Sequence, residues 1–202
     1  IEKSDLIFFT VPDDKIAAVY SGIDKKLLRG KMICHCSGAL TTDEAFVGYN
    51  LVEDLAAFSV HPLAAISDRL SSFSLIPSIF FFIEGDEVRL SELEDFLRVQ
   101  GITRIRRLKS SCKTRYHLAA ATVSNLILAL IECGIEALME CGLTEADARE
   151  ALTPLIRNNL ENVLLKGPMN SLTGPVSRGD VNTVRKHLKE LKDPENRAIY
   201  TN

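Results

Sequence analysis

The sequence predicts an α/β protein in which a sheet of mainly parallel strands is followed by an all-helical domain. Short apolar runs alternate with helical patterns over the first half of the chain, which is typical of a parallel sheet covered by helices. The strand-like runs stop after residue 109, and from there the apolar residues recur at helical spacing. We therefore predict a first domain over residues 1–109 and a helical domain over residues 110–202.

Each predicted strand is a short apolar run that ends at residues which interrupt strands. The first run, 5–11 (DLIFFTV), ends at Pro12, and the second, 31–36 (KMICHC), ends at Ser37-Gly38. The remaining predicted strands are 55–60, 78–86 and 102–108. Because the last of these is shorter and more polar than the others, we expect it at an edge of the sheet.

Helical patterns follow the strands. In the first half of the chain they are DDKIAAVYSGI from residue 13, TTDEAF from residue 41 and EVRLSELEDFLRVQ from residue 87. In the second half they predict helices over 111–141, 144–165 and 180–191, with a helical tail from Pro194. The most apolar stretch, 118–131, is shorter than the roughly 20 apolar residues of a membrane-spanning helix. We therefore expect it to form a buried helix.

Charge and cysteine content restrict the classes of function. A net charge of −3 gives no general attraction to phosphate backbones or anionic membranes, so we expect neither a nucleic-acid nor a membrane partner. The five cysteines are an odd number without disulfide-framework spacing, and no secretory signal precedes them. These features favour a reducing, cytoplasmic location.

The segment Cys34-His35-Cys36 raises the question of a metal site. Side chains alternate along a strand, so both thiols would point to one face of the sheet and the imidazole to the other. No second cysteine pair follows at zinc-site spacing. We therefore predict no metal and interpret the cysteines as small core residues.

Three predicted strand ends carry small, rigid or hydrogen-bonding residues. In open parallel sheets, ligands bind beyond the carboxyl ends of the strands, where loops and helix N-termini converge. The three segments are Thr10-Val11-Pro12-Asp13, His35-Cys36-Ser37-Gly38 and His61-Pro62. They indicate a ligand site along one rim of the sheet. The alternative is that proline and glycine only end the strands, with the histidine satisfied locally.

The first helix of the second domain places ionisable and small residues on one face. Residues at i, i+4, i+7 and i+11 share this face: Lys113, His117, Ala120 and Ser124, flanked by Tyr116 and Asn125. Such a face suits a pocket in which a substrate packs against alanines while Lys113 or His117 transfers a proton. The alternative is a solvated first helical turn that covers the domain junction.

Several segments together resemble a known superfamily of reductases. They are DLIFFTVPDDKI, HCSGAL, HPL, KTRYHLAAATVSN and LTGPVSRGD, and they extend over nearly the whole chain. In this superfamily an NAD(P)-binding Rossmann domain precedes a helical domain, as in 6-phosphogluconate dehydrogenase, pyrroline-5-carboxylate reductase and ketopantoate reductase. More closely, the chain resembles a bacterial family described as a Rossmann-like domain joined to a helical domain of unknown function.

The resemblance implies a fold and a cofactor. Residues 1–109 would be the C-terminal part of a Rossmann-type domain, and residues 110–202 a helical substrate and dimerisation domain. The cofactor would be NADP, with NAD as the alternative. No G-x-G occurs among the 11 glycines, so we expect the strand and glycine-rich turn that cradle the pyrophosphate to lie upstream of Ile1.

The resemblance also implies roles for individual residues. The cofactor-binding positions would be Thr10, Val11, Pro12, Ser37, Gly38, His61 and Pro62. The candidate catalytic residues would be Lys113, His117 and Asn125, and the substrate-binding residues Ser124, Thr173, Gly174 and Arg178. Ketopantoate reductases carry asparagines at the places of His117 and Ala121, so the chain departs from their pattern there.

These observations predict an NAD(P)H-dependent reductase of a small carbonyl or imine acid, with a 2-oxo acid such as ketopantoate as the specific expectation. The alternative is a non-catalytic dinucleotide-binding or sensor protein of the same fold. The helix that includes Leu126 to Ile131 is apolar nearly all round, so we expect a homodimer built on the helical domain.

The segment SLTGPVSRGD contains Arg178-Gly179-Asp180, a tripeptide that adhesion proteins present to integrins. The predicted cytoplasmic location argues against adhesion. Gly174-Pro175 predicts a turn, and Asp180 directly precedes a helical pattern that it could cap. Arg178 could reach a substrate carboxylate through a two-pronged contact.

Overall fold

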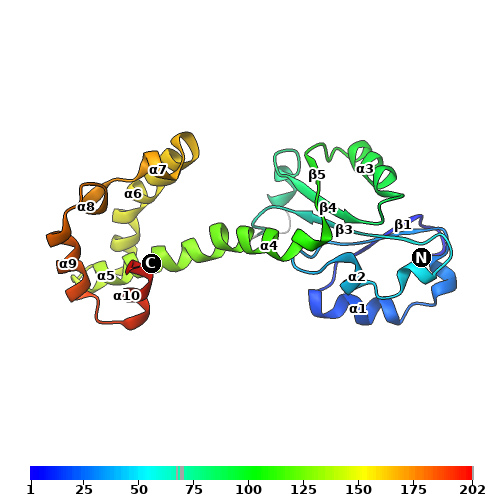
Figure 1. The fold of residues 1–202 in the computed structure, drawn as a ribbon, viewed down its shortest axis with the longest axis horizontal. Coiled ribbons are helices and arrows are strands. Elements are labelled where there is room, and N and C mark those ends of the chain that lie inside the picture. Colours follow the sequence, from blue (N-terminus) through cyan, green and yellow to red (C-terminus); the bar gives the residue numbers. More distant parts are fainter. Residues whose placement is uncertain (67, 69–70, 202) are drawn as a thin grey trace. The chain divides into compact units, whose positions relative to one another are not determined.

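The computed structural model describes residues 1–66, 68 and 71–201 and divides the chain into two compact units, Ile1–Ser124 and Asn125–Asn202. The first unit contains the sheet and the second is helical (Figure 1). The predicted fold class, an α/β Rossmann-like sheet followed by helices, is confirmed. The first unit extends beyond the predicted domain boundary at residue 109, because it includes the first helix after the sheet.

Within the described residues, the sheet has five strands that lie side by side in sequence order. They are β1 (Leu6–Phe9), β2 (Met32–His35), β3 (Ala56–Pro62), β4 (Phe81–Gly85) and β5 (Ile105–Arg107). β1, β2 and β3 are parallel neighbours, whereas β4 is antiparallel to β3 and parallel to β5. The sheet is therefore mainly parallel, with one antiparallel step, and β5 forms an edge as predicted.

Two helices contribute to the core on one face of the sheet. They are α1 (Asp13–Ser21) and the short α2 (Thr42–Ala45), whose Thr41 forms a capping box with Glu44. The rings of Phe9, Tyr20 and Phe46 meet edge to face, with centroids 5.0 to 6.5 Å apart. Three 3-10 turns connect these elements: η1 (Lys25–Leu28), η2 (Tyr49–Leu51) and, after β3, η3 (Ser71–Leu75).

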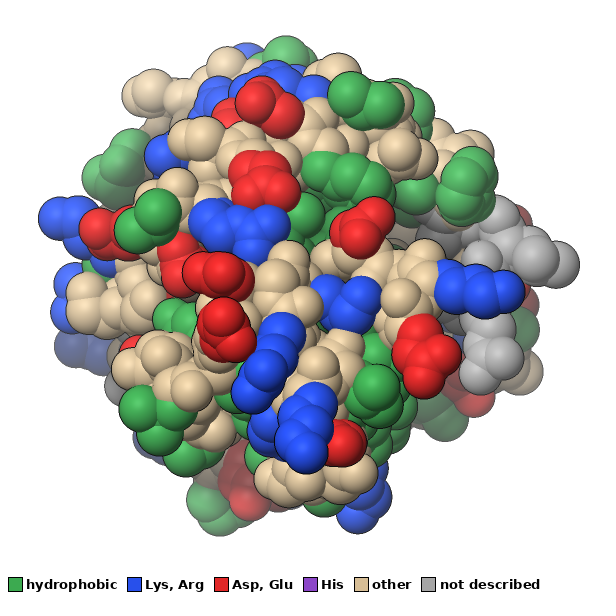
Figure 2. Space-filling model, turned by 90° about the vertical axis from the view of Figure 1, so that its right-hand side faces the viewer, with side chains coloured by type: hydrophobic (Ala, Val, Ile, Leu, Met, Phe, Trp, Pro, Cys, Tyr) green, Lys and Arg blue, Asp and Glu red, His purple; other side chains and the backbone are tan. Residues whose placement is uncertain are grey.

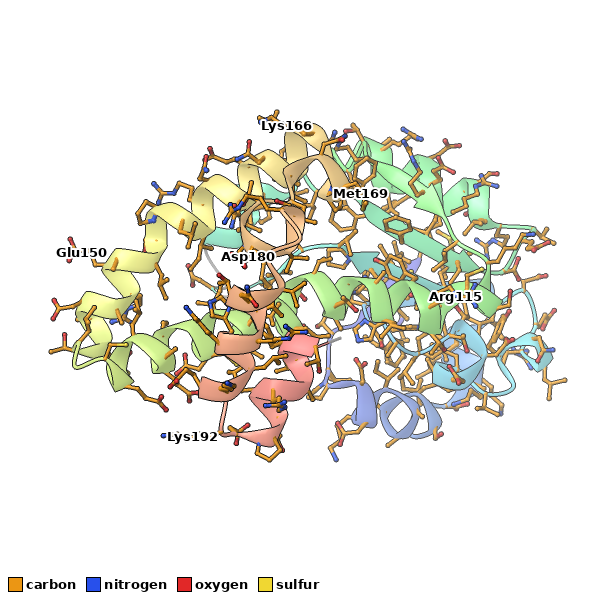
Figure 3. The ribbon with its side chains drawn as sticks, turned by 60° about the vertical axis from the view of Figure 1, so that its left-hand side comes forward. Arg115, Glu150, Lys166, Met169, Asp180 and Lys192 are labelled. Carbon is orange, nitrogen blue, oxygen red and sulfur yellow. The ribbon has the colours of Figure 1, made fainter. Side chains whose placement is uncertain are left out.

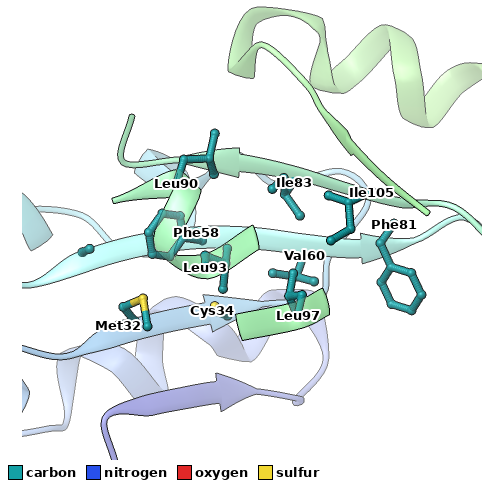
Figure 4. Close-up of a cluster of buried hydrophobic side chains, with 11 residues drawn as sticks. Met32, Cys34, Phe58, Val60, Phe81, Ile83, Leu90, Leu93, Leu97 and Ile105 are labelled. Atoms are coloured by element: carbon teal, nitrogen blue, oxygen red, sulfur yellow. The ribbon is translucent and has the colours of Figure 1, made fainter. Parts of the chain in front are cut away.

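The other face of the sheet is covered by α3 (Leu90–Val99). Its buried residues Leu90, Leu93 and Leu97 recur at helical spacing and pack against side chains of β2 to β5 (Figure 4). Cys34 belongs to this cluster, while its neighbour His35 contacts Phe46 on the opposite face. The alternation expected along this strand is thus observed.

A long helical run follows the sheet. It comprises η4 (Ser110–Cys112), α4 (Lys113–Ala121), one turn of π-helix, η5 (Thr122–Leu126), and α5 (Ile127–Glu140). By length and composition alone, Ser110–Glu140 could cross a membrane, and only 6% of its most apolar 18-residue window is buried. Residues 118–131 span the boundary between the two units, and their expected burial stays a prediction. The helix runs beyond the apolar segment at both ends, and its apolar side chains surround the axis rather than one stripe.

The second unit contains α5 and five further helices within its described residues. These are α6 (Glu145–Lys166), α7 (Pro168–Ser171), α8 (Gly174–Ser177), α9 (Val181–Glu190) and α10 (Pro194–Thr201). The short α7 and α8 were not predicted. The turn expected at Gly174-Pro175 forms the beginning of α8. Gly174 has a φ of 84°, which favours glycine, and Pro175 lies in the first helical turn, where proline is tolerated.

Asp180 caps α9 as predicted. Its carboxylate accepts hydrogen bonds from the backbone N–H of Thr183 (3.0 Å) and from the Thr183 hydroxyl (2.7 Å). Figure 3 shows Asp180 at the beginning of this helix. These hydrogen bonds lower the pKa of Asp180, because they favour the carboxylate form. The aspartate of the adhesion-like tripeptide therefore has a local structural function.

We expect Asp180→Ala to lower the melting temperature, because the substitution leaves N–H groups in the first turn of α9 without their acceptor. The measurement is thermal unfolding followed by circular dichroism. Asp180→Asn is the matched control, since its amide oxygen can still accept the bond and should retain most of the stability. Equal melting temperatures for wild type and Asp180→Ala would show that the cap is unimportant.

Candidate active site

The three predicted rim segments follow the carboxyl ends of adjacent parallel strands. Thr10-Val11-Pro12 follows β1, Ser37-Gly38 follows β2, and His61-Pro62 ends β3. Because parallel neighbours present their carboxyl ends at the same edge, the structure brings these segments together at one rim. Their roles in binding a cofactor remain predictions.

A network of hydrogen bonds fixes the turn after β2. The Ser37 hydroxyl accepts from the backbone N–H groups of Ala39 (3.1 Å) and Leu40 (2.9 Å) and donates to the carboxylate of Asp13 (2.6 Å). The Ser37 N–H in turn donates to Nδ1 of His35 (3.1 Å). Asp13, in the first turn of α1, thereby joins the ends of β1 and β2. The sequence predicted Asp13 both at this rim and at the start of a helix.

Gly38 lies against two imidazole rings. A Cβ atom at this position would be 2.7 Å from Nε2 of His61 and 2.7 Å from Nδ1 of His117. Contacts this short do not occur, so a side chain at residue 38 would displace one or both rings. The close approach of backbone and imidazoles therefore requires glycine.

Two residues of α4 contact two cross-strand residue pairs of the sheet. Ser59 lies opposite Glu84 in the β3–β4 register, and His61 lies opposite Phe82 two residues further along. The first pair contacts Lys113, and the second contacts Tyr116, one helical turn later. Lys113 and Tyr116 are three residues apart, so the two contacts are made by successive turns of the same helix.

The first of these contacts buries a lysine. Lys113 is 1% exposed, and its ammonium group donates to the Ser59 hydroxyl and, at 3.4 Å, to Oε1 of Glu84. Burial lowers the pKa of Lys113, whereas Glu84 and, more weakly, Asp13 act to raise it. A lysine with a lowered pKa releases a proton more readily at neutral pH than an exposed one.

The second contact joins a histidine and a tyrosine. Nδ1 of His61 lies 2.6 Å from the Tyr116 hydroxyl, and the His117 ring is 6.3 Å from the His61 ring. Burial first of all, with smaller contributions from Lys113 and His117, lowers the pKa of His61 to about 4. Burial raises the pKa of Tyr116 to about 12. At neutral pH the pair is therefore an uncharged imidazole and a protonated phenol.

Glu84 is a site residue that the sequence analysis missed. It is 2% exposed and lies near the end of β4, beside Lys113. The available signal was a single acidic residue inside an otherwise apolar strand pattern, SIFFFIEGD. A charged residue in such a position is buried only when it is paired.

The other predicted site residues lie at the end of the first unit or in the second unit. Ser124 ends the first unit and donates to the backbone carbonyl of Ala120. Asn125, Thr173, Gly174 and Arg178 belong to the second unit. The rim is thus assembled from the first unit, and the substrate-binding roles of the second-unit residues remain predictions.

Charged side chains outside the rim are largely balanced. Arg98 and Arg107 both pair with Glu94, at 2.6 and 3.0 Å. On the face shown in Figure 2, basic, acidic and apolar side chains are interspersed. Among the described residues, no group of three or more His, Cys, Asp and Glu side chains could hold a metal ion. The rim around Lys113 and His61 therefore remains the strongest candidate site.

Comparisons with known proteins agree with this architecture. The family described as "Domain of unknown function (DUF2520)" matches residues 79–202. No curated protein sequence matches the chain. The solved structure of protein TM1727 from Thermotoga maritima is 27% identical in sequence, with a TM-score of 0.79 over 98% of this chain and 74% of that one.

Two further solved structures share the fold at lower sequence identity. BF3122 from Bacteroides fragilis, described as a candidate NADP oxidoreductase, is 20% identical, with a TM-score of 0.73 over 98% of this chain and 73% of that one. Pyrroline carboxylate reductase from Plasmodium falciparum, solved with NADP bound, is 14% identical, with a TM-score of 0.63 over 98% and 75%.

The His61 environment gives a direct test of the site geometry. We expect the imidazole of His61 to titrate near pH 4 and Lys113→Met to raise this midpoint, because the substitution removes a positive charge that disfavours protonation. The measurement is an NMR titration of the histidine side chains. Lys109→Met, which removes an exposed lysine from the same unit, is the control and should leave the midpoint unchanged. An unchanged midpoint in Lys113→Met would contradict the described geometry.

Proposed function

The chain belongs to the DUF2520 family, and we propose that it is a nicotinamide-dinucleotide-dependent reductase of a small carbonyl or imine acid, with NADP as its cofactor. One observation carries the proposal. A buried ammonium group, Lys113, lies beside the carboxyl rim of parallel strands, where two imidazoles pack against Gly38. Buried charges with shifted pKa values at such a rim are typical of catalytic sites.

The residues at the rim fit a dinucleotide. The Ser37–Leu40 turn at the end of β2 is already held in place by its hydrogen bonds. The segment Thr10-Val11-Pro12 would contact the ribose and phosphate region. When bound, NADPH would supply a hydride. The NADP-bound reductase of the same fold supports this choice of cofactor.

Within this proposal, Lys113 supplies the proton. Its pKa is lowered by burial, and an acid works best when its pKa approaches the working pH. His117 is the alternative donor, because it lies one helical turn after Lys113 and its ring lies against Gly38. The uncharged His61 and Tyr116 beside them would keep the local positive charge confined to Lys113.

The substrate would be a small acid. We assign its carboxylate to Arg178, with Thr173, Gly174, Ser124 and Asn125 contributing hydrogen bonds or shape. Structures with this fold include a pyrroline carboxylate reductase and an imine reductase from Pseudomonas sp., so cyclic imines belong in the panel beside 2-oxo acids such as ketopantoate. A protein that bound the dinucleotide but turned over none of these acids would be a sensor, which is the alternative function.

We expect Lys113→Met to lower kcat by about 100-fold or more, the usual contribution of a positioned proton donor. The measurement is the oxidation of NADPH with the best acid of the panel, using protein that contains the complete dinucleotide-binding domain. His117→Ala is the comparison. If Lys113→Met retains wild-type kcat while His117→Ala loses it, the proton comes from His117 instead.

We further propose that a second copy of the chain covers the exposed apolar helix. Apolar side chains at positions 118, 123, 126, 128 and 130 are all more than half exposed in the single chain. Their window has a mean hydropathy of 1.9, and apolar surface of this kind marks an interface. A parallel or antiparallel helix pair would remove it from water on both copies at once.

We expect light scattering at about 10 µM to give the mass of a dimer, as for an interface that buries upwards of roughly 1,000 Å². Leu126→Glu, at the centre of the exposed run, should convert it to a monomer, because a charge would be buried in the interface. Leu164→Glu, at an exposed leucine of α6, is the control and should remain dimeric. Binding to lipid vesicles in place of dimer formation would contradict the proposal.

A further inference from the structure

Glu84 is buried in the sheet with every carboxylate oxygen engaged. Oε1 accepts from the Thr42 backbone N–H (2.9 Å), the Thr42 hydroxyl (3.1 Å) and the Lys113 ammonium (3.4 Å). Oε2 accepts from the Ser110 hydroxyl (2.6 Å). The carboxylate of β4 thus joins α2, η4 and the first residue of α4.

Stability alone does not explain the buried ion pair between Glu84 and Lys113. Two buried charges lose their hydration, and well-packed apolar residues of the same volume stabilise a fold equally well or better. The cluster on this face of the sheet already contains Phe9, Phe46 and Ala57. An apolar pair of similar volume at residues 84 and 113 would extend this cluster, so the charged pair points to a requirement of the site.

We propose that Glu84 is a positioning residue for Lys113, which fixes the ammonium group beside Ser59 and keeps it charged inside the protein. The inference rests on the proposed function insofar as Lys113 is the proton donor. The arrangement of Glu84 itself is independent of any substrate.

Other charged and titratable groups around Lys113 act in both directions. Asp13 on α1 and Cys36 after β2 act to raise its pKa, as Glu84 does more strongly. Conversely, the charge of Lys113 lowers the pKa of His35 on β2 and of His61 on β3. Glu44 on α2 is exposed, and it too has its pKa lowered by Lys113. Glu84 contacts the ammonium directly, so its removal takes away the strongest effect that opposes the lowering of the Lys113 pKa by burial.

The experiment compares Glu84→Gln, Glu84→Asp and a matched control, Glu94→Gln. Glutamine keeps the shape of the side chain, and its amide can still accept from Thr42 and donate to Ser110. Glu94 pairs with Arg98 and Arg107 on α3 and β5, so Glu94→Gln also removes one ion-paired carboxylate from this unit. The first readout is the NMR titration of the Lys113 side chain without cofactor or substrate.

We expect Glu84→Gln to move the Lys113 titration to lower pH and Glu84→Asp to restore it in part, while Glu94→Gln has no effect. With substrate, kcat of Glu84→Gln should fall at least ~10-fold near pH 8 and recover as the pH is lowered. A Lys113 titration that is unchanged in folded Glu84→Gln would overturn the proposal, as would a pH-independent loss of kcat.

A second variant keeps the proposal testable if Glu84→Gln does not fold. If Glu84→Gln fails to fold, the double variant Glu84→Gln/Lys113→Met removes both charges and should fold again, because no buried charge remains unpaired. Failure of the double variant as well would show a purely structural role and overturn the proposal. If NADPH oxidation is never observed, the proposed function fails, but the titration of Lys113 still decides the role of Glu84.

Discussion

The contact between Lys113 and Glu84 is the interaction on which the rest of the site depends. It ties the first residue of α4 to β4, and Ser59 on β3 completes the binding of the ammonium group. Since Glu84 also accepts from Thr42 and Ser110, removing its side chain would leave these donors without this acceptor. With Lys113 fixed, the next turn of α4 brings Tyr116 to His61 and His117 to Gly38. The buried ion pair between Lys113 and Glu84 therefore helps to position the rings of Tyr116 and His117.

The same interaction sets the charge distribution at the rim. Burial lowers the pKa values of His35 and His61 to about 3 and 4, and the positive charge of Lys113 contributes to both shifts. An uncharged His35 can accept the N–H of Ser37, which shapes the turn that contains Gly38. Electrostatics and backbone geometry are thus coupled, because a protonated His35 could not act as acceptor at Nδ1.

The sequence predicted most of the fold because its signals are local. Pro12, Ser37 and Pro62 end the first three strands close to where the apolar runs stop, and the cap at Asp180 needs only the helix that follows it. The Lys113–Glu84 contact was not predictable in this way. It joins residues 29 positions apart, and it depends on the antiparallel register that places Ser59 opposite Glu84. Neither strand direction nor register can be read from an apolar run of five residues. What covers the long helix is not predictable for a similar reason, since an all-round apolar pattern does not tell whether the same chain or another covers it.

The division into two units suggests how one scaffold can serve different substrates. On the proposed function, the cofactor rim and the proton donor belong to the first unit, where glycine, buried charges and backbone hydrogen bonds leave little freedom for substitution. Arg178, Thr173 and Gly174 lie in the second unit, on or beside the short helix α8 and at exposed or half-exposed positions. Substitutions there would change which acid binds without disturbing the buried pair. Chemistry fixed on the sheet and selectivity carried by the helices would let one fold serve several substrates.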